Sequence, residues 1–187
     1  MKLNVEISEM FLSDAKDYLN RYEILKEKST HIGLRSKLLL ELLFAFECSL
    51  KSLIFLESSE NEKKTYDKII THKIDNLVKL LSISSKNELE KLLTVKIHHF
   101  NVGIRYQLES EIDFRNESGV LDEKYYNTIA NFKWLDEFST QISNFVKYIE
   151  RLNPLKLEIK SISDININEE IEKHKRIIQL RQKIITL

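Results

Sequence analysis

Apolar residues recur at intervals of three and four along most of the chain, which is the spacing of one face of an α-helix. The first such pattern runs from Ser8, a residue type typical of N-caps, to about Leu25. From Leu34 to about Glu57 the apolar stripe is much wider. A stripe of that width predicts the central helix of a bundle, covered by neighbours on more than one side.

The middle of the chain alternates between polar connections and shorter periodic segments. The polar run 58–64 predicts a loop, and the next helix is expected to begin near Thr71. A capping-box pattern that begins at Ser85 predicts a further helix, which extends to about Phe100. Residues 101–119 hold two of the glycines and a mixed sequence, so we expect an irregular connection there.

The longest regular pattern begins at Asp122, an expected N-cap, and predicts one helix that ends at Asn153, because Pro154 follows. Apolar and charged residues then alternate at 155–160, which is a short strand-like signal. The tail from Asn168 is periodic again, with acidic residues first and basic residues last. That order suits the helix dipole and predicts an amphipathic helix.

Composition supports a helical fold. The 187 residues include three glycines and one proline, fewer than most β-containing folds need for their turns. The expected fold class is therefore all-α. We expect two parts, a helical bundle at 1–153 and, at 154–187, a strand-like linker with a C-terminal amphipathic helix for docking or oligomerisation.

Charge and cysteine content limit the partners and the location. Lys plus Arg and Asp plus Glu each number 29, so no global basic field draws the chain to nucleic acid. The single cysteine, Cys48, cannot form an internal disulfide. The N-terminus has no apolar signal core, and Glu41, Glu47 and Lys51 interrupt the longest apolar stretch. We therefore expect a cytoplasmic protein that makes no contact with membranes.

Three short motifs occur in order along the predicted helices. Glu47 and Lys51 form an E-x3-K pair, residues 71–77 read THKIDNL, and Arg105–Tyr106 form an R-Y pair. This set resembles the HEPN family of helical bundles, which occurs in bacterial toxin–antitoxin and phage-defence systems. The resemblance extends over roughly residues 10–151 and implies an up-and-down helical bundle that often forms a homodimer.

The resemblance also implies a possible chemistry, because many catalytic HEPN proteins are metal-independent ribonucleases. Their active site is an Arg followed, after four to six residues, by a His; the Arg binds phosphate and the His transfers protons. This sequence has no such pair. Its nearest candidates for catalysis are His98, His99 and Arg105, which form either an atypical nuclease site or a helix end and a loop anchor. No metal or cofactor is expected.

Five other residues are candidates for binding. Glu47 and Lys51 either line a cleft or form a half-buried ion pair that fixes helix register. His72 is expected to pack in the bundle and to form a hydrogen bond with the neighbouring turn. Tyr106 and Arg115 belong to an alternation of aromatic and basic residues that supports base stacking and phosphate contact, although nearby acidic residues oppose it.

Two functions remain open from the sequence. The first is a non-catalytic or degenerate HEPN-like interaction module of a toxin–antitoxin or antiviral defence system. It would form a homodimer and bind a partner protein through the C-terminal helix. The second is a metal-independent endoribonuclease toxin with an atypical His/Arg site, which would bind RNA or a nucleotide. The missing motif and the neutral charge favour the first.

Overall fold

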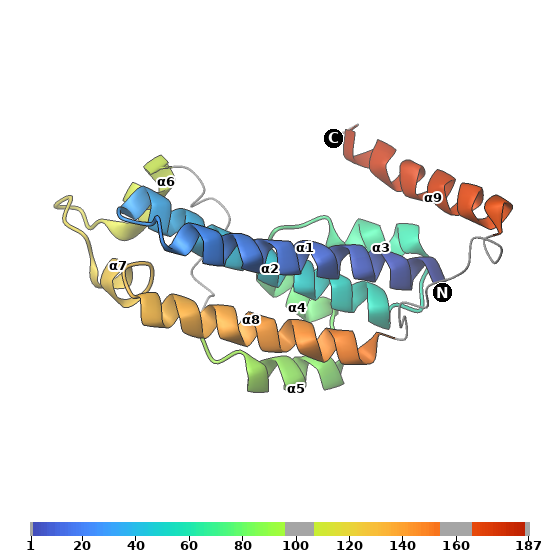
Figure 1. The fold of residues 1–187 in the computed structure, drawn as a ribbon, viewed down its shortest axis with the longest axis horizontal. Helices are drawn as coiled ribbons and strands as arrows, with labels where there is room; N and C mark the ends of the chain where they lie inside the picture. The colour runs from blue at the N-terminus through green and yellow to red at the C-terminus, as the bar shows by residue number, and fades with distance from the viewer. Residues whose placement is uncertain (1, 96–106, 154–165, 186–187) are drawn as a thin grey trace.

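The computed structural model describes residues 2–95, 107–153 and 166–185, and in these ranges it confirms the all-α class (Figure 1). In chain order the helices are α1 (Lys2–Lys26), α2 (Ile32–Glu57), α3 (Glu62–Ile69), α4 (Ile74–Leu80), α5 (Ile83–Leu92), α6 (Gln107–Phe114), α7 (Glu123–Asn127), α8 (Phe132–Leu152) and α9 (Ile167–Ile185). None of the helices in these ranges is long and apolar enough to cross a membrane. The predicted strand-like linker at 155–160 lies outside the described residues.

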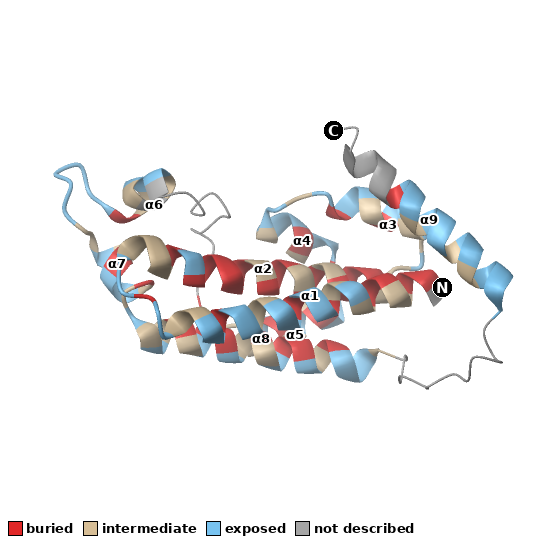
Figure 2. Ribbon diagram, turned by 45° about the horizontal axis from the view of Figure 1, so that its top comes forward, coloured by how far each residue is buried: buried red, intermediate tan, exposed pale blue. Residues whose placement is uncertain are grey.

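The long helices α1, α2 and α8 lie side by side and form the body of the molecule (Figures 1 and 2). Sixteen of the 26 residues of α2 are buried, because α1 and α8 cover two of its sides and α3, α4 and α6 also contact it. The prediction of a central helix is therefore confirmed. Its Phe46 packs against Phe138 and Phe145 of α8, with ring centroids 6.3 and 6.0 Å apart.

Polar contacts attach α8 to α1 at both of its ends. Near the start of α8, the Tyr22 hydroxyl donates a hydrogen bond to Asp136 over 2.8 Å, and Lys26 contacts the same carboxylate oxygen at 2.5 Å. Beyond its last residue, the Asn153 amide donates to the Glu9 carboxylate over 2.6 Å. These contacts fix the lengthwise register of the two helices, which apolar packing alone leaves less defined.

Two predicted helix starts are wrong, because serines with the right local spacing serve contacts between helices. Ser8 lies inside α1, is buried, and shares a 2.9 Å hydrogen bond with Ser52 of α2. Ser85 lies inside α5 and donates to the Glu57 carboxylate over 2.5 Å. The actual N-cap of α5 is Ser82, whose side chain accepts the backbone N–H of Ser85.

Two predicted connections contain helices, and one predicted helix is divided. Helix α3 begins within the polar run 58–64, where Asn61 caps it, and α6 lies within the expected irregular segment 101–119. Asp122 is an N-cap as predicted, but it caps the short α7. The chain then leaves the helical path, and Asn131 caps α8. The apolar spacing continues across this break, so periodicity alone gave one helix.

The predicted C-terminal helix is confirmed as α9, which lies outside the three long helices and beside α3 (Figures 1 and 2). Two ion pairs attach it: Arg176 contacts Glu62 of α3 at 2.5 Å, and Lys173 contacts Glu6 of α1 at 3.2 Å. Leu180 on the same side of α9 is buried. The helix is thus held to the bundle by one face.

Candidate functional site

The structure brings together three of the predicted site residues, Glu47, Lys51 and His72, which we call the Glu47 cluster. Helix α2 places Glu47 and Lys51 one turn apart, and His72 approaches from the connection between α3 and α4. The Lys51 Nζ lies 2.7 Å from a carboxylate oxygen of Glu47. The His72 Nδ1 lies 3.0 and 3.1 Å from the two oxygens of the same carboxylate.

Burial differs sharply within this cluster. The side chain of Glu47 is 5% exposed and that of Lys51 is 12% exposed, whereas that of His72 is 68% exposed. A buried carboxylate is stable only when charge and hydrogen bonds compensate its lost hydration; Lys51 provides a positive charge, and Lys51 and His72 both contact the carboxylate oxygens. The predicted ion pair is confirmed, and it lies deeper than expected. The predicted partner of His72 was wrong, because the imidazole binds α2 instead of its neighbouring turn.

The cluster also orients the imidazole. Since an ionised carboxylate only accepts hydrogen bonds, the Nδ1 of His72 carries the hydrogen that faces Glu47. The other ring nitrogen, Nε2, is then the one available to solvent or to a ligand. A carboxylate that fixes the tautomer and the ring direction in this way prepares a histidine for proton transfer. It equally attaches the α3–α4 connection to α2.

Cys48, next to Glu47 in the sequence, is not a candidate nucleophile. It is half-buried and packs against the core. Burial, together with the negative charges of Asp14 and Glu47, raises the pKa of the Cys48 thiol to about 12. The thiol therefore stays protonated at neutral pH, and the nucleophilic thiolate is scarcely populated.

The predicted alternation of aromatic and basic residues includes Phe114 next to Arg115. Only part of it can contact a nucleic acid. Phe114 is fully buried and packs edge-on against Tyr125, with centroids 6.2 Å apart, so its ring cannot stack on a base. Arg115 bonds to the Glu111 carboxylate and donates to the carbonyl oxygen of Gly119 over 2.7 Å. The Arg115 side chain thus closes the turn in which Gly119 adopts a left-handed φ of 74°.

The remaining predicted site residues are His98, His99, Arg105 and Tyr106, and all four lie outside the described residues. Their proposed nuclease chemistry therefore stays a prediction. That chemistry requires these residues to lie close to one another, or close to the exposed imidazole of His72, in the assembled protein.

Sequence reasoning missed a pocket of about 560 Å³ between α5 and α8. Its lining residues are Leu92, Asn144, Lys147, Glu150 and Arg151. The α8 residues recur at helical spacing on the polar side of that helix, and this signal is visible in the sequence. The contribution of α5 is not, because no local pattern shows which helix packs against which.

Known proteins give no further guide to these sites. Comparison of the chain with family models, with curated proteins and with solved structures found no match. The resemblance to the HEPN family therefore rests on the sequence motifs, two of which meet in the Glu47 cluster. The function of the chain has to follow from the chemistry of its own surfaces.

Proposed function

We propose that this chain is a non-catalytic, HEPN-like interaction module that forms a homodimer through the outer face of α9. Its place in a toxin–antitoxin or phage-defence system is part of the proposal and rests on the motif resemblance. The observation that carries the interaction role is a second apolar face on α9, opposite the face that contacts the bundle.

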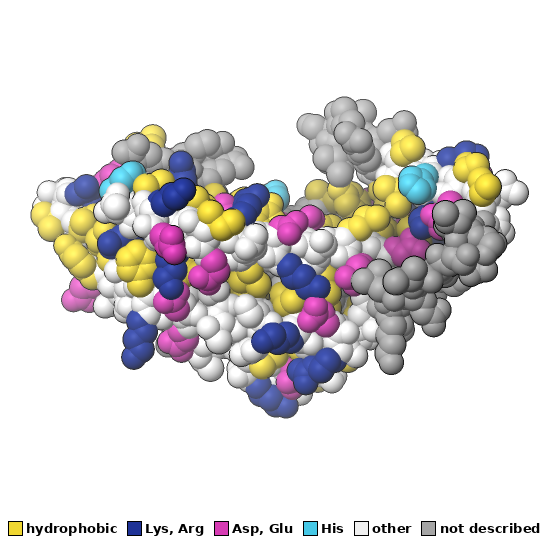
Figure 3. Space-filling model, in the orientation of Figure 1, with side chains coloured by type: hydrophobic (Ala, Val, Ile, Leu, Met, Phe, Trp, Pro, Cys, Tyr) yellow, Lys and Arg dark blue, Asp and Glu magenta, His cyan; other side chains and the backbone are white. Residues whose placement is uncertain are grey.

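The two faces of α9 are distinct. Toward the bundle lie Lys173, Arg176 and Leu180, which make the contacts described above. Away from it, Ile171 and Ile178 are 47% and 51% exposed. They are seven residues apart and so share one side of the helix; Ile167, 70% exposed and one turn earlier, extends the row. Figure 3 shows hydrophobic side chains on the exposed surface of α9.

A row of isoleucines at this spacing is the pattern by which two helices pair. The charge order along α9 supports a second copy of the same chain as the partner. Glu169, Glu170 and Glu172 lie in its first part, and every charged residue after Glu172 is basic. When two copies run antiparallel, the acidic part of each faces the basic part of the other. This arrangement has the two-fold symmetry of most homodimers.

The mass of the full chain in solution, measured by size-exclusion chromatography with light scattering, tests this proposal. We expect a dimer for the wild type and a monomer for Ile171→Glu/Ile178→Glu, because the substitution places four carboxylates in one seam. The matched control is Ile24→Glu/Ile83→Glu, which changes two isoleucines that are 56% and 79% exposed on α1 and α5. The control should stay dimeric, and circular dichroism should show unchanged helix content in both variants.

A monomeric wild type contradicts the proposal directly. A dimer that survives the α9 substitutions excludes α9 as the interface, and loss of the dimer in both double variants means that added negative charge, not the α9 seam, separates the subunits.

A second candidate function, a metal-independent endoribonuclease, is favoured by the geometry of His72. The Glu47 carboxylate holds one ring nitrogen and leaves the other available, as a general acid or base requires. Attack by a ribose 2′-hydroxyl on the adjacent phosphate needs one group to remove a proton and another to supply one. His98, His99 and Arg105 would have to provide the second histidine and the phosphate contact.

Incubation of the purified protein with total RNA and transfer RNA in the presence of EDTA separates the two functions. The non-catalytic module predicts no cleavage. EDTA-resistant cleavage that His72→Gln abolishes, and that His98→Ala/His99→Ala/Arg105→Ala also abolishes, would establish the ribonuclease and overturn the preferred function. His31→Gln is the control; it removes an exposed histidine 16 residues, or about 24 Å of helix, from Glu47.

A further inference from the structure

The pocket between α5 and α8 has a composition that neither function uses. Leu92, at the end of α5, forms an apolar wall, and α8 contributes Asn144, Lys147 and Arg151. These three residues follow one another at intervals of three and four, so they lie along one side of α8. The side chains of Asn144, Lys147 and Arg151 are exposed and so accessible to a ligand from solution.

The residues that line the pocket carry a net positive charge. Its single acidic lining residue, Glu150, forms a 2.7 Å ion pair with Lys16 of α1 and is neutralised there. Within the described part of the chain, neither Lys147 nor Arg151 has an ion pair with a carboxylate. Two cations one turn apart repel each other, so the pocket favours an anion. Figure 3 shows Lys and Arg side chains gathered along the lower edge, over α5 and α8.

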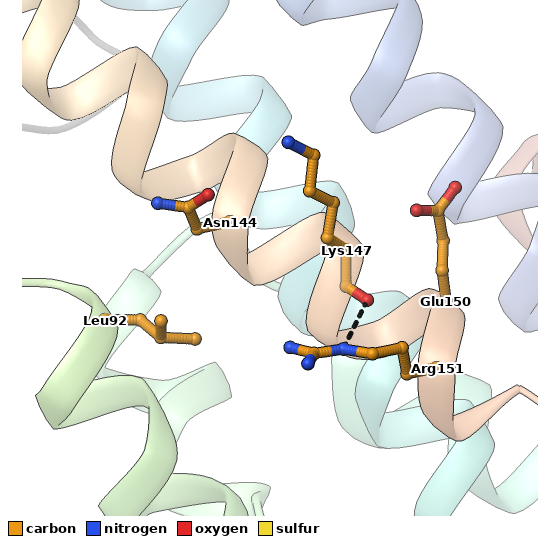
Figure 4. Close-up of a pocket in the computed structure, with 5 residues that line it drawn as sticks. All are labelled: Leu92, Asn144, Lys147, Glu150 and Arg151. Atoms are coloured by element: carbon orange, nitrogen blue, oxygen red, sulfur yellow. Dashed lines mark hydrogen bonds between the residues drawn. The ribbon is translucent and has the colours of Figure 1, made fainter.

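The direction of the Arg151 side chain fits an anion between α5 and α8, whereas the Lys147 ammonium points away from the Arg151 guanidinium (Figure 4). The Nε of Arg151 donates a 3.3 Å hydrogen bond to the backbone oxygen of Lys147, which turns the guanidinium back over the pocket. Figure 4 shows the Arg151 guanidinium and Leu92 pointing toward one another, while Glu150 points away from the guanidinium. Among the described residues, the two terminal nitrogens of Arg151 have no hydrogen-bond partner, and a guanidinium binds oxyanions through such paired donors.

The helix dipole explains why a positive charge is favoured at Arg151, but it does not explain the positive charge at Lys147. Arg151 lies in the last turn of α8, where the helix dipole favours a positive charge. Lys147 lies more than one turn before the end of α8, where this effect has faded. Its flexible stem allows the ammonium to reach a ligand as a point charge, and the Asn144 amide can add a neutral donor.

We propose that the α5–α8 pocket binds a phosphate group, carried by a small phosphate ester whose apolar part lies against Leu92. Arg151 provides the paired donors, Lys147 the second charge and Asn144 an amide donor. The volume of about 560 Å³ accommodates more than the phosphate alone. This site is independent of α9 and of the Glu47 cluster.

Nuclear magnetic resonance titration of the full chain tests the proposal, with inorganic phosphate and phenyl phosphate as probes and sodium chloride at equal ionic strength as the baseline. We expect both probes to shift the Arg151 Nε–H and Asn144 amide signals, and phenyl phosphate to bind more tightly because its ring contacts Leu92. Lys147→Gln/Arg151→Gln should weaken binding of either probe by at least about tenfold, since two charge-assisted contacts are lost. Lys133→Gln, which removes an exposed charge at the other end of α8, should leave binding unchanged.

Three results would overturn the inference. The first is the absence of any shift beyond that given by sodium chloride. The second is equal weakening in the pocket variant and in Lys133→Gln, which would show general charge screening. The third is binding of inorganic phosphate with no preference for phenyl phosphate, which would reduce the site to one for the free anion and remove the role of Leu92.

Discussion

Replacing Lys51 by methionine leaves the Glu47 carboxylate buried with one cation fewer. Removal of one partner from a buried ion pair usually costs about 3–5 kcal/mol of unfolding free energy. Here the carboxylate keeps both contacts with His72, and the exposed His72 lets water approach one side of the cluster. We therefore expect Lys51→Met to lower the unfolding free energy by about 2–3 kcal/mol, somewhat less than that range.

The double variant Glu47→Leu/Lys51→Met tests the same reasoning from the other side. It removes both buried charges and fills the space with apolar atoms, so its stability should lie within about 1 kcal/mol of the wild type. His72 loses its partner, but water can replace it because the ring is largely exposed. The single variant should thus be less stable than the double variant.

Urea denaturation followed by circular dichroism at one fixed protein concentration measures these differences. Lys16→Met is the matched control, because Lys16 pairs with Glu150 where both side chains are more than 40% exposed. It should change the unfolding free energy by less than about 0.5–1 kcal/mol. A Lys51→Met variant as stable as this control, or a double variant as unstable as Lys51→Met, would refute the account of a buried carboxylate that depends on Lys51.

Three further predictions concern other parts of the chain. The hydrogen bonds from Arg176 lower the pKa of Glu62 below its ordinary value of 4.5, so their contribution to holding α9 is complete above that pH and is lost as the pH falls through the lowered pKa. Hydrogen exchange of the α9 amides, taken relative to the intrinsic exchange rate at each pH, should quicken in that range, and Glu62→Gln should remove this pH dependence. Because burial and nearby carboxylates raise the pKa of Cys48, iodoacetamide at pH 8 should modify it slowly in the folded protein and rapidly after unfolding in urea; equal rates would contradict the burial. Ser82→Ala should lower the unfolding free energy by about 1–2 kcal/mol, since it removes the N-cap of α5 and a 2.7 Å contact with Glu57, and urea melts can show whether it does.

The features that local sequence predicted correctly are those that depend on neighbours along one helix. The wide apolar stripe of α2 and the periodicity of α9 each gave a helix in the right place. Glu47 and Lys51 are one turn apart, so their ion pair follows from helix geometry alone. The contact between Glu47 and His72 joins residues 25 positions apart, and no local pattern contains it.

The errors have a common physical origin, which is that one side chain can satisfy either a local or a distant partner. A serine hydroxyl that fits an N-cap fits a hydrogen bond between helices equally well, and this is why Ser8 and Ser85 misled the prediction. The break between α7 and α8 was missed because apolar residues keep their spacing on both sides of Asn131. The α5–α8 pocket depends on tertiary packing, so its Arg151 did not stand out among the exposed charges of α8.

The double attachment of α8 to α1 has a consequence for how the chain folds during synthesis. Helices α1 and α2 are adjacent in sequence and can pair as soon as both have been made. About 75 residues separate the end of α2 at Glu57 from the start of α8 at Phe132, which corresponds to roughly 4–15 s of translation. Throughout that interval α8 does not cover the Phe46 side of α2. The α1–α2 hairpin of the nascent chain therefore exposes apolar surface that can associate with other unfinished chains. A chaperone that shields this side until Asn153 emerges would have most effect on the yield of folded protein.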